Sequence, residues 1–141
     1  MSAEESFFDS NVLVYLTDEA SGKSERTEDL LADGGVISVQ VMNEFANVAR
    51  RKVQLNWVET REFLDTFRAT LKIVPLTLET HERGLDLAER YGLSVYDGVI
   101  VAAALLAGCR TLYSEDMHNG LVIDRLTIRN PYAGLASSQN P

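Results

Sequence analysis

The most informative segment is an apolar run with the sequence Asp97-Gly98-Val99-Ile100-Val101-Ala102-Ala103-Ala104-Leu105-Leu106-Ala107. We expect Asp97 to open a helix whose body, Val99 to Ala107, is apolar on every side, and Gly108 to end it. A helix that is apolar all round lies in the interior of a domain, covered by other elements. The run is far too short to cross a bilayer, which needs roughly 20 residues. A central, covered helix is therefore the first element of the predicted fold.

Apolar runs rich in β-branched and aromatic residues surround this helix in the sequence. The predicted strands are Ser6 to Asp9, Val36 to Val39, Ile73 to Leu76, Arg110 to Tyr113 and Leu126 to Ile128. Pro75 favours an edge position for the third of them, because proline cannot donate to a neighbouring strand. Helical patterns separate the strands, at Ser24 to Ala32, Gln40 to Lys52, Asn56 to Leu71 and Glu79 to Tyr91, with a short helix or turn at Val12 to Leu16.

This alternation predicts an α/β fold, a three-layer sandwich whose mostly parallel central sheet is covered by helices on both faces. With 141 residues and no repeat or linker, the chain has the size of one domain. We expect that domain to span residues 1–132, and we expect residues 133–141, which are small and polar, to form a flexible tail.

Charge limits the function classes. Lys and Arg number 13 against 21 Asp and Glu, a formal net charge of −8. So acidic a chain is a poor candidate for broad, sequence-blind binding of nucleic acid. The densest basic cluster is Arg50-Arg51-Lys52. It could contact RNA, or it could be a solvated helix end at which the helix dipole favours cations.

The start of the chain and its cysteine usage bear on location. Residues 1–5 are acidic and lack the basic segment of a signal peptide, so we expect a cytoplasmic protein without a membrane segment. Cys109 is the only cysteine, which excludes an intrachain disulfide and a cysteine-based metal site. We expect it to be a buried, unreactive thiol.

Acidic residues fall at special places in this pattern. Asp9 ends the first strand, Asp97 starts the buried helix and Asp116 follows the strand that ends at Tyr113. Ligands of open α/β sheets bind at the carboxyl ends of the strands, so these acids should gather there. Glu44, one turn into the helix after the second strand, can point over the same edge. Each acid alone could be a cap, a turn residue or a solvated helix residue. Together they would repel one another unless a cation were bound.

The ligand set predicts the metal. Oxygen ligands suit Mg²⁺ or Mn²⁺, whereas zinc prefers histidine and cysteine. His81 lies in a charged helix and should be at the surface, and His118 is a weak candidate for contact with substrate or with the water shell of the metal. The sequence has no Gly-rich phosphate loop and no G-x-S-x-G nucleophile motif.

Four segments in order resemble the PIN-domain family, most closely its VapC-type toxins of toxin–antitoxin pairs. They are Phe7-Phe8-Asp9-Ser10-Asn11-Val12-Leu13, Val41-Met42-Asn43-Glu44-Phe45, Ser94 to Ala104 with the core Tyr96-Asp97-Gly98, and Leu112-Tyr113-Ser114-Glu115-Asp116-Met117. The resemblance covers about Ser6 to Tyr132. It implies an Mg²⁺- or Mn²⁺-dependent endoribonuclease, a homodimer, and inhibition by a small antitoxin protein whose tail enters the acidic groove.

Carried over position by position, the acids of the family motifs fall on Asp9, Glu44, Asp97 and Asp116. The small hydroxyl or amide positions fall on Ser10, Asn11 and Ser114, and Glu115 becomes a possible accessory acid. As a hypothesis, the four acids hold one or two Mg²⁺ ions, and water activated by the metal hydrolyses the RNA phosphodiester. Gly98 departs from the alanine common after the acid, which weakens the start of the helix.

Three alternatives stay open at this point. A haloacid-dehalogenase-like phosphatase also starts with an Asp after a strand, but it needs a second acid where Asn11 stands. A receiver-like signalling domain needs a phosphoacceptor Asp ending a middle strand and a Lys near the last strand, and neither is found. A catalytically silent PIN-like domain that binds a partner would not need four acids. Apolar side chains on Val12 to Leu16 and around Phe45 and Phe63 exceed the needs of one small core, which also favours a homodimer.

Overall fold

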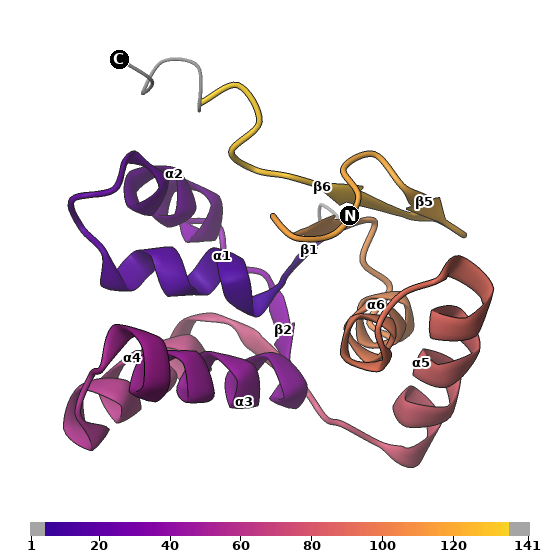
Figure 1. Ribbon diagram of the computed structural model, residues 1–141, viewed down its shortest axis with the longest axis horizontal. Helices are drawn as coiled ribbons and strands as arrows, with labels where there is room; N and C mark the ends of the chain where they lie inside the picture. Colours follow the sequence, from indigo (N-terminus) through magenta and orange to yellow (C-terminus); the bar gives the residue numbers. More distant parts are fainter. Residues whose placement is uncertain (1–4, 136–141) are drawn as a thin grey trace.

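The computed structural model describes residues 5–135 (Figure 1). Its strands are β1 (Ser6–Phe8), β2 (Val36–Ser38), β3 (Lys72–Val74), β4 (Thr111–Tyr113), β5 (Val122–Ile123) and β6 (Leu126–Arg129). Its α-helices are α1 (Ser10–Val14), α2 (Gly22–Leu31), α3 (Val39–Val48), α4 (Trp57–Thr70), α5 (Leu78–Tyr91) and α6 (Val95–Leu106). A 3₁₀ turn, η1 (Tyr15–Thr17), follows α1, and a π-helical turn, η2 (Ala49–Val53), follows α3.

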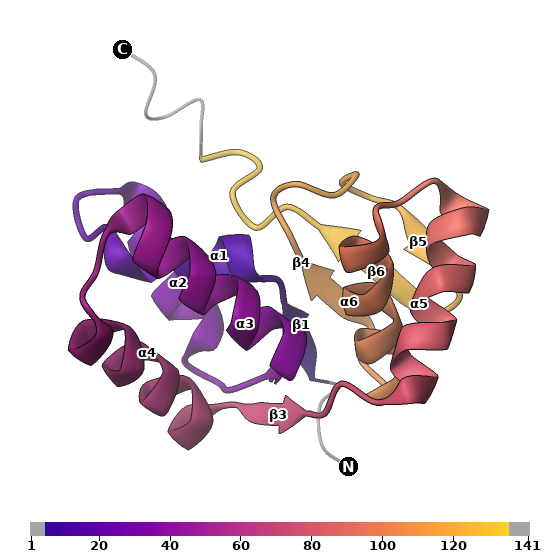
Figure 2. The ribbon, with the colours of Figure 1, turned by 60° about the horizontal axis from the view of Figure 1, so that its bottom comes forward.

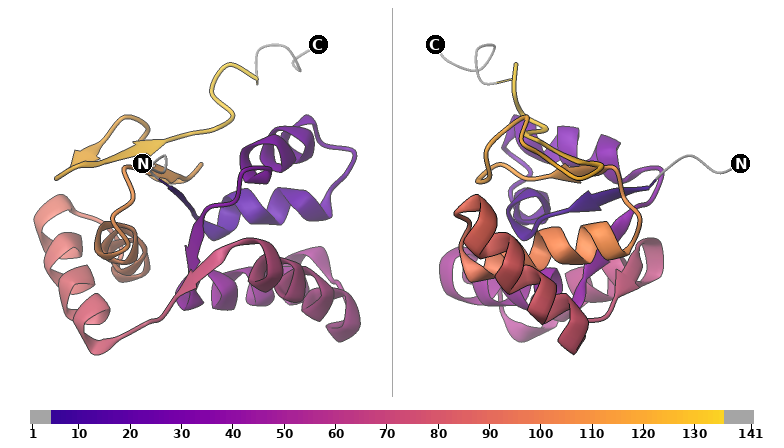
Figure 3. Two further views of the ribbon diagram at one scale, coloured as in Figure 1. Left: turned by 180° about the vertical axis from the view of Figure 1, so that it is seen from behind. Right: turned by 90° about the vertical axis from the view of Figure 1, so that its right-hand side faces the viewer.

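The strands form one sheet in the order β3-β2-β1-β4-β6-β5. All neighbours are parallel except β5 and β6. Helices α1 to α4 lie on one side of the sheet, and α5 and α6 lie on the other (Figures 1 and 3). The predicted three-layer α/β sandwich is therefore confirmed. So is the edge position of the third strand, since β3 ends the sheet beside β2 (Figure 2).

Helix α6 is the central helix that the apolar run predicts. Its residues 98–104 are all buried, and α5 packs along it. The two helices approach most closely where Gly84 of α5 meets Gly98 of α6. A Cβ atom on Gly98 would lie 2.3 Å from the carbonyl oxygen of Gly84, and a Cβ on Gly84 would lie 2.7 Å from Cγ2 of Val99. Gly98 is thus required by helix packing, which explains why alanine is absent beside Asp97.

Several predicted element boundaries are wrong, each for a local reason. Val39 belongs to α3 and not to a strand, because the Ser38 hydroxyl accepts from the amide of Val41 and caps the helix. Helix α2 starts earlier than predicted, with Ser21 as its cap, while Ser24 is buried inside it. The α-helix expected to reach Lys52 ends at Val48 and continues as η2. Strand β5 was not predicted at all.

Other local predictions are confirmed. Asn56 and Glu59 form the expected reciprocal capping box at the start of α4. Cys109 is buried, and this burial raises the pKa of its thiol to about 11, so it is unreactive at neutral pH. No helix within residues 5–135 is long and apolar enough to cross a membrane.

The apolar residues expected to face a second subunit are instead part of this chain's core. Val12 and Leu13 are fully buried, and residues 14–16 pack against the same core. The rings of Phe45 and Phe63 lie 5.8 Å apart and both pack on Phe67. These side chains fill the space between α1, α3 and α4 of this chain, so they do not by themselves require a second subunit.

The end of the described chain is a turn. The amide of Leu135 donates to the carbonyl of Tyr132, and the Leu135 side chain packs on the core. The remainder of the predicted tail, residues 136–141, lies outside the described residues.

Candidate active site

The carboxyl ends of β1, β2 and β4 meet at one edge of the sheet. Phe8 of β1 pairs with Tyr113 of β4, and Phe7 pairs with Val36 of β2, all in parallel. Asp9 directly follows β1, in the middle of this edge. The segments that carry the other predicted acids start from the same region: α3 after β2, the first turn of α6, and the loop after β4.

Asp9 is the buried centre of the site, with only 3% of its surface exposed. Its Oδ1 accepts from the amide of Ser10 at 2.7 Å, which caps α1. Its Oδ2 accepts from the Ser114 hydroxyl at 2.8 Å and from the Asn11 side-chain amide at 3.3 Å. Burial raises the pKa of Asp9 to about 7 in spite of these hydrogen bonds. The carboxylates of Glu44 and Asp97 raise it further.

Glu44 is tied to the same centre. The Ser10 hydroxyl donates to its Oε1 at 3.0 Å, so one residue contacts both Asp9 and Glu44. The other oxygen, Oε2, accepts from the side-chain amide of Gln40, one turn earlier on α3, at 2.9 Å. These two bonds hold the Glu44 carboxylate toward Asp9.

Asp97 lies in the first turn of α6 and does not open the helix as predicted. Ser94 is the N-cap, and its hydroxyl accepts from the amide of Asp97 at 3.1 Å. Burial raises the pKa of Asp97, and the charges of Glu44 and Asp116 add to this. Asp116 itself is exposed, in the loop after β4. The Asp97 side chain is thus not needed as the cap and faces other acids.

The four predicted acids are therefore close together, since Glu44 and Asp97 raise the pKa of Asp9, and Glu44 and Asp116 raise the pKa of Asp97. They do not form a ready-made shell, because no three acidic, histidine or cysteine side chains of residues 5–135 converge at metal-binding distance. The donors are nevertheless all carboxylate oxygens, the ligands that Mg²⁺ and Mn²⁺ prefer. His81 is exposed on α5, as predicted, and His118 is exposed beside Asp116.

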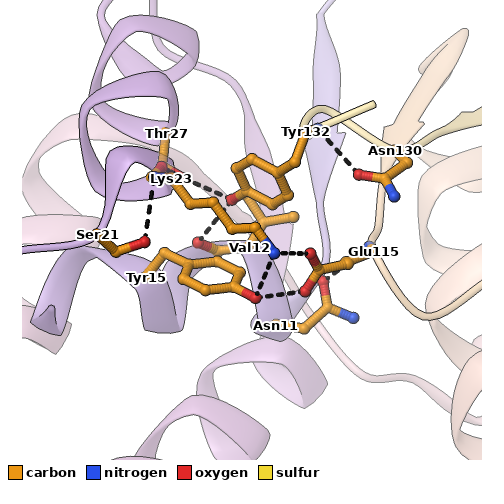
Figure 4. A network of polar contacts seen from close by, with 9 residues as sticks. All are labelled: Asn11, Val12, Tyr15, Ser21, Lys23, Thr27, Glu115, Asn130 and Tyr132. Atoms are coloured by element: carbon orange, nitrogen blue, oxygen red, sulfur yellow. Dashed lines mark hydrogen bonds and ion pairs between the residues drawn. The ribbon is translucent and has the colours of Figure 1, made fainter. Parts of the chain in front are cut away.

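The four accessory positions divide into two groups. Ser10, Asn11 and Ser114 hydrogen-bond the acids directly, as described above, and the Asn11 amide also reaches Ser114 at 3.4 Å. Glu115 belongs to a different network (Figure 4). Its carboxylate forms an ion pair with Lys23 at 2.5 Å and accepts from the Tyr15 hydroxyl.

Lys23 is a residue that the sequence reasoning missed, because no basic residue was expected near these loops. It comes from α2, donates also to the Tyr15 hydroxyl at 3.2 Å, and lies over the rings of Tyr15 and Tyr132. The Tyr132 hydroxyl in turn bonds Thr27 at 2.6 Å (Figure 4). Asn11 joins the two groups, since its side-chain oxygen accepts from the amide of Glu115.

The predicted basic cluster lies at η2. Arg50 is engaged within the chain: its Nη1 donates to the Leu55 carbonyl at 2.6 Å, and its guanidinium stacks 4.4 Å from the Trp57 ring. Its Nε is buried without a hydrogen-bond partner in the described residues. Arg51 and Lys52 are exposed. Two of the three cations are therefore accessible to a ligand.

Fold and site together define an α/β protein with an acidic site at the carboxyl edge of a mostly parallel sheet. A family model described as the PIN domain matches residues 6–118, which include all four acids. The chain therefore belongs to the PIN domain family. No match was found among curated proteins.

Solved structures of similar fold include toxins. A toxin–antitoxin complex from Klebsiella pneumoniae is 21% identical, with a TM-score of 0.69 over 90% of this chain and 98% of the other. VapC20 of Mycobacterium tuberculosis, described as a sarcin-ricin loop cleaving toxin, is 15% identical, with a TM-score of 0.67 over 79% and 89%. VapBC2 of Rickettsia felis, bound to a promoter DNA fragment, is 22% identical, with a TM-score of 0.64 over 89% and 97%. At these identities the likeness shows a common fold.

Proposed function

We propose that the chain is an Mg²⁺-dependent endoribonuclease, able to use Mn²⁺, and that it is the toxin of a toxin–antitoxin pair. The observation that carries the proposal is the group of carboxylates at one sheet edge, in a chain of the PIN domain family. Asp9 is buried there beside two other acids, and no Lys or Arg is among the groups that shift the pKa of Asp9 or Asp97. Such an arrangement is stable at neutral pH only when protons or a cation reduce the repulsion.

Asp9, Glu44 and Asp97 would hold the cation, with Asp116 completing the set from the rim. When bound, the cation supplies Lewis-acid chemistry, in that it neutralises phosphate charge and makes water a stronger nucleophile at neutral pH. The hydroxyls of Ser10 and Ser114 keep the carboxylates in place. The products would carry 5′-phosphate and 3′-hydroxyl ends.

The partner and assembly proposals rest on different features. The similar structures include toxin–antitoxin complexes, which supports an antitoxin as partner. A short DNA-binding protein encoded next to this chain would be the candidate. We also propose a homodimer, and the exposed Leu78 and Leu85, seven residues apart on α5, are candidates for its contact surface. The proposed place of action is the cytoplasm.

Cleavage of purified RNA in Mg²⁺, in Mn²⁺ and in EDTA tests the proposal. We expect cleavage in both metals and none in EDTA, and Asp9→Asn and Asp97→Asn should each abolish it. Asp86→Asn, an exposed carboxylate on α5, is the matched control. Calorimetric titration with Mn²⁺ provides a readout independent of activity. Cleavage that persists in chelator, or a site variant that binds Mn²⁺ as well as the parent chain, would overturn the proposal.

A further inference from the structure

A hollow next to the acidic site has no role in the mechanism above. It has a volume of about 340 Å³ and is lined by Gln40, Asn43, Glu44 and Asn47 of α3 and by Tyr96 of α6. Spacings of three and four residues place the α3 members on one face of the helix. Glu44 belongs to both the hollow and the acidic site, so a molecule held at the acids can extend into the hollow.

Apart from Glu44, the side chains that line the hollow are uncharged, with three amides and one phenol ring. Asn43 and Asn47 are exposed, and their side-chain amides make no hydrogen bond within residues 5–135. Each amide offers two donors and one acceptor. Tyr96 is 65% exposed although it is a large aromatic residue in the first turn of the central helix. No Lys or Arg lines the hollow, so it is not built for a phosphate.

We propose that this hollow binds one unpaired nucleobase of the RNA substrate, next to the scissile phosphate. The base stacks on Tyr96, and the amides of Asn43 and Asn47 hydrogen-bond its edge. Proteins recognise single-stranded RNA in this way, by aromatic stacking and by polar contacts to base edges. The inference rests on the proposed ribonuclease function and adds to it the group that selects the cleavage position.

The test compares Tyr96→Ala, Tyr96→Phe and the double variant Asn43→Ala/Asn47→Ala with the parent chain. Alanine at two exposed helix positions should raise the melting temperature slightly, so lost function cannot be ascribed to unfolding. Val122→Ala is the control. It shortens an exposed apolar side chain in β5, the last strand of the sheet at the end opposite β3. Affinity is measured in EDTA with a short single-stranded RNA and with a copy that carries one abasic position scanned along it.

We expect Tyr96→Ala to weaken affinity for the intact RNA about 10-fold and to make it insensitive to the abasic position. Tyr96→Phe should keep most of the affinity of the parent chain, because its ring can still stack. The Asn43→Ala/Asn47→Ala variant should discriminate less between the four bases at the cleavage site. Because binding is measured without metal, it can succeed even if the chain proves inactive, which separates this inference from the proposed function. Unchanged affinity in Tyr96→Ala would overturn it. So would light scattering in which the variants change the oligomeric state instead, since the hollow would then bind a second copy.

Discussion

Asp9→Asn is expected to stabilise the metal-free protein at alkaline pH while it abolishes cleavage. The pKa of Asp9 is about 7 in the folded chain, against an ordinary value of 3.8. Each pKa unit corresponds to about 1.4 kcal/mol, so the charged carboxylate lowers the free energy of unfolding by at most about 4 kcal/mol. The asparagine would still cap α1 through Oδ1 but would lose the bonds from Ser114 and Asn11 to Oδ2. Each bond is worth about 1 kcal/mol, which leaves a net gain of about 2 kcal/mol.

The sign of the pH dependence follows from the raised pKa. Between pH 4 and pH 7 the folded chain keeps the Asp9 proton while the unfolded chain has lost it, so stability falls as the pH rises through this window. Above pH 7 the full penalty is present, and below pH 4 it is absent. The asparagine variant has no such term. The difference in stability between variant and parent should therefore grow from pH 4 to pH 8.

Urea denaturation in EDTA at pH 5, 6.5 and 8 measures this difference, with Asp86→Asn as the control. Addition of Mg²⁺ at pH 8 should stabilise the parent chain more than the Asp9 variant, because binding to the folded state raises its stability. The reasoning is refuted if the variant is less stable at pH 8, or if the difference between variant and parent is the same at every pH. Asp9 would then be only a helix cap.

Three further predictions concern other parts of the molecule. Gly98→Ala should lower the free energy of unfolding by about 1–3 kcal/mol, because overpacking against α5 exceeds the helix-propensity gain of about 1 kcal/mol; urea denaturation checks it, and a stabilised variant would contradict the packing argument. Lys23→Met should lower the free energy of unfolding by about 1–3 kcal/mol, because the half-buried Glu115 carboxylate loses its cation. Arg83→Met removes an exposed ion pair with Glu79, 3.8 Å long, and should change the free energy of unfolding by less than about 0.5 kcal/mol. Equal effects of the two variants would contradict this. Joint replacement of Arg51 and Lys52 by alanine should weaken RNA affinity and reduce the slope of log affinity against log salt by about 1–2, and an unchanged slope would make the cluster a solvated helix end.

The layer architecture could be predicted because each element carries its own pattern. The apolar run of α6 and the β-branched strands are local signals, and they place Asp9, Glu44 and Asp97 relative to the strand ends without any tertiary information. The Ser94 cap also has a local signal, since Ser94 stands three residues before Asp97 and precedes an apolar run.

The remaining features depend on contacts that no local pattern encodes. Lys23 and Glu115 are 92 residues apart, and their pairing depends on how α2 packs beside the loop after β4. Considered alone, Gly98 only weakens its helix. The need for glycine there becomes clear only from the close contact between Gly98 and the backbone of Gly84. Strand β5 is two residues long and exists because β6 offers a free edge. The Lys23–Glu115 pair and the Gly84–Gly98 contact were missed because each partner lies on another element, whereas β5 was missed because two residues are too short a run to show a strand pattern.

The acids of the site are placed where local structure does not require a charge. Asn or Ser would cap α1 as well as Asp9 does, without burial of a carboxylate. Asp97 stands in a helix turn that Ser94 already caps, beside the carboxylate of Glu44. Glu44 is held toward Asp9 by the Ser10 hydroxyl, although the two carboxylates repel each other. Three separate segments thus bring charge of one sign to one edge and lower the stability of the metal-free chain. A bound cation, as proposed above, would relieve the penalty at Asp9 and Asp97 together, which no structural role of the individual acids would achieve.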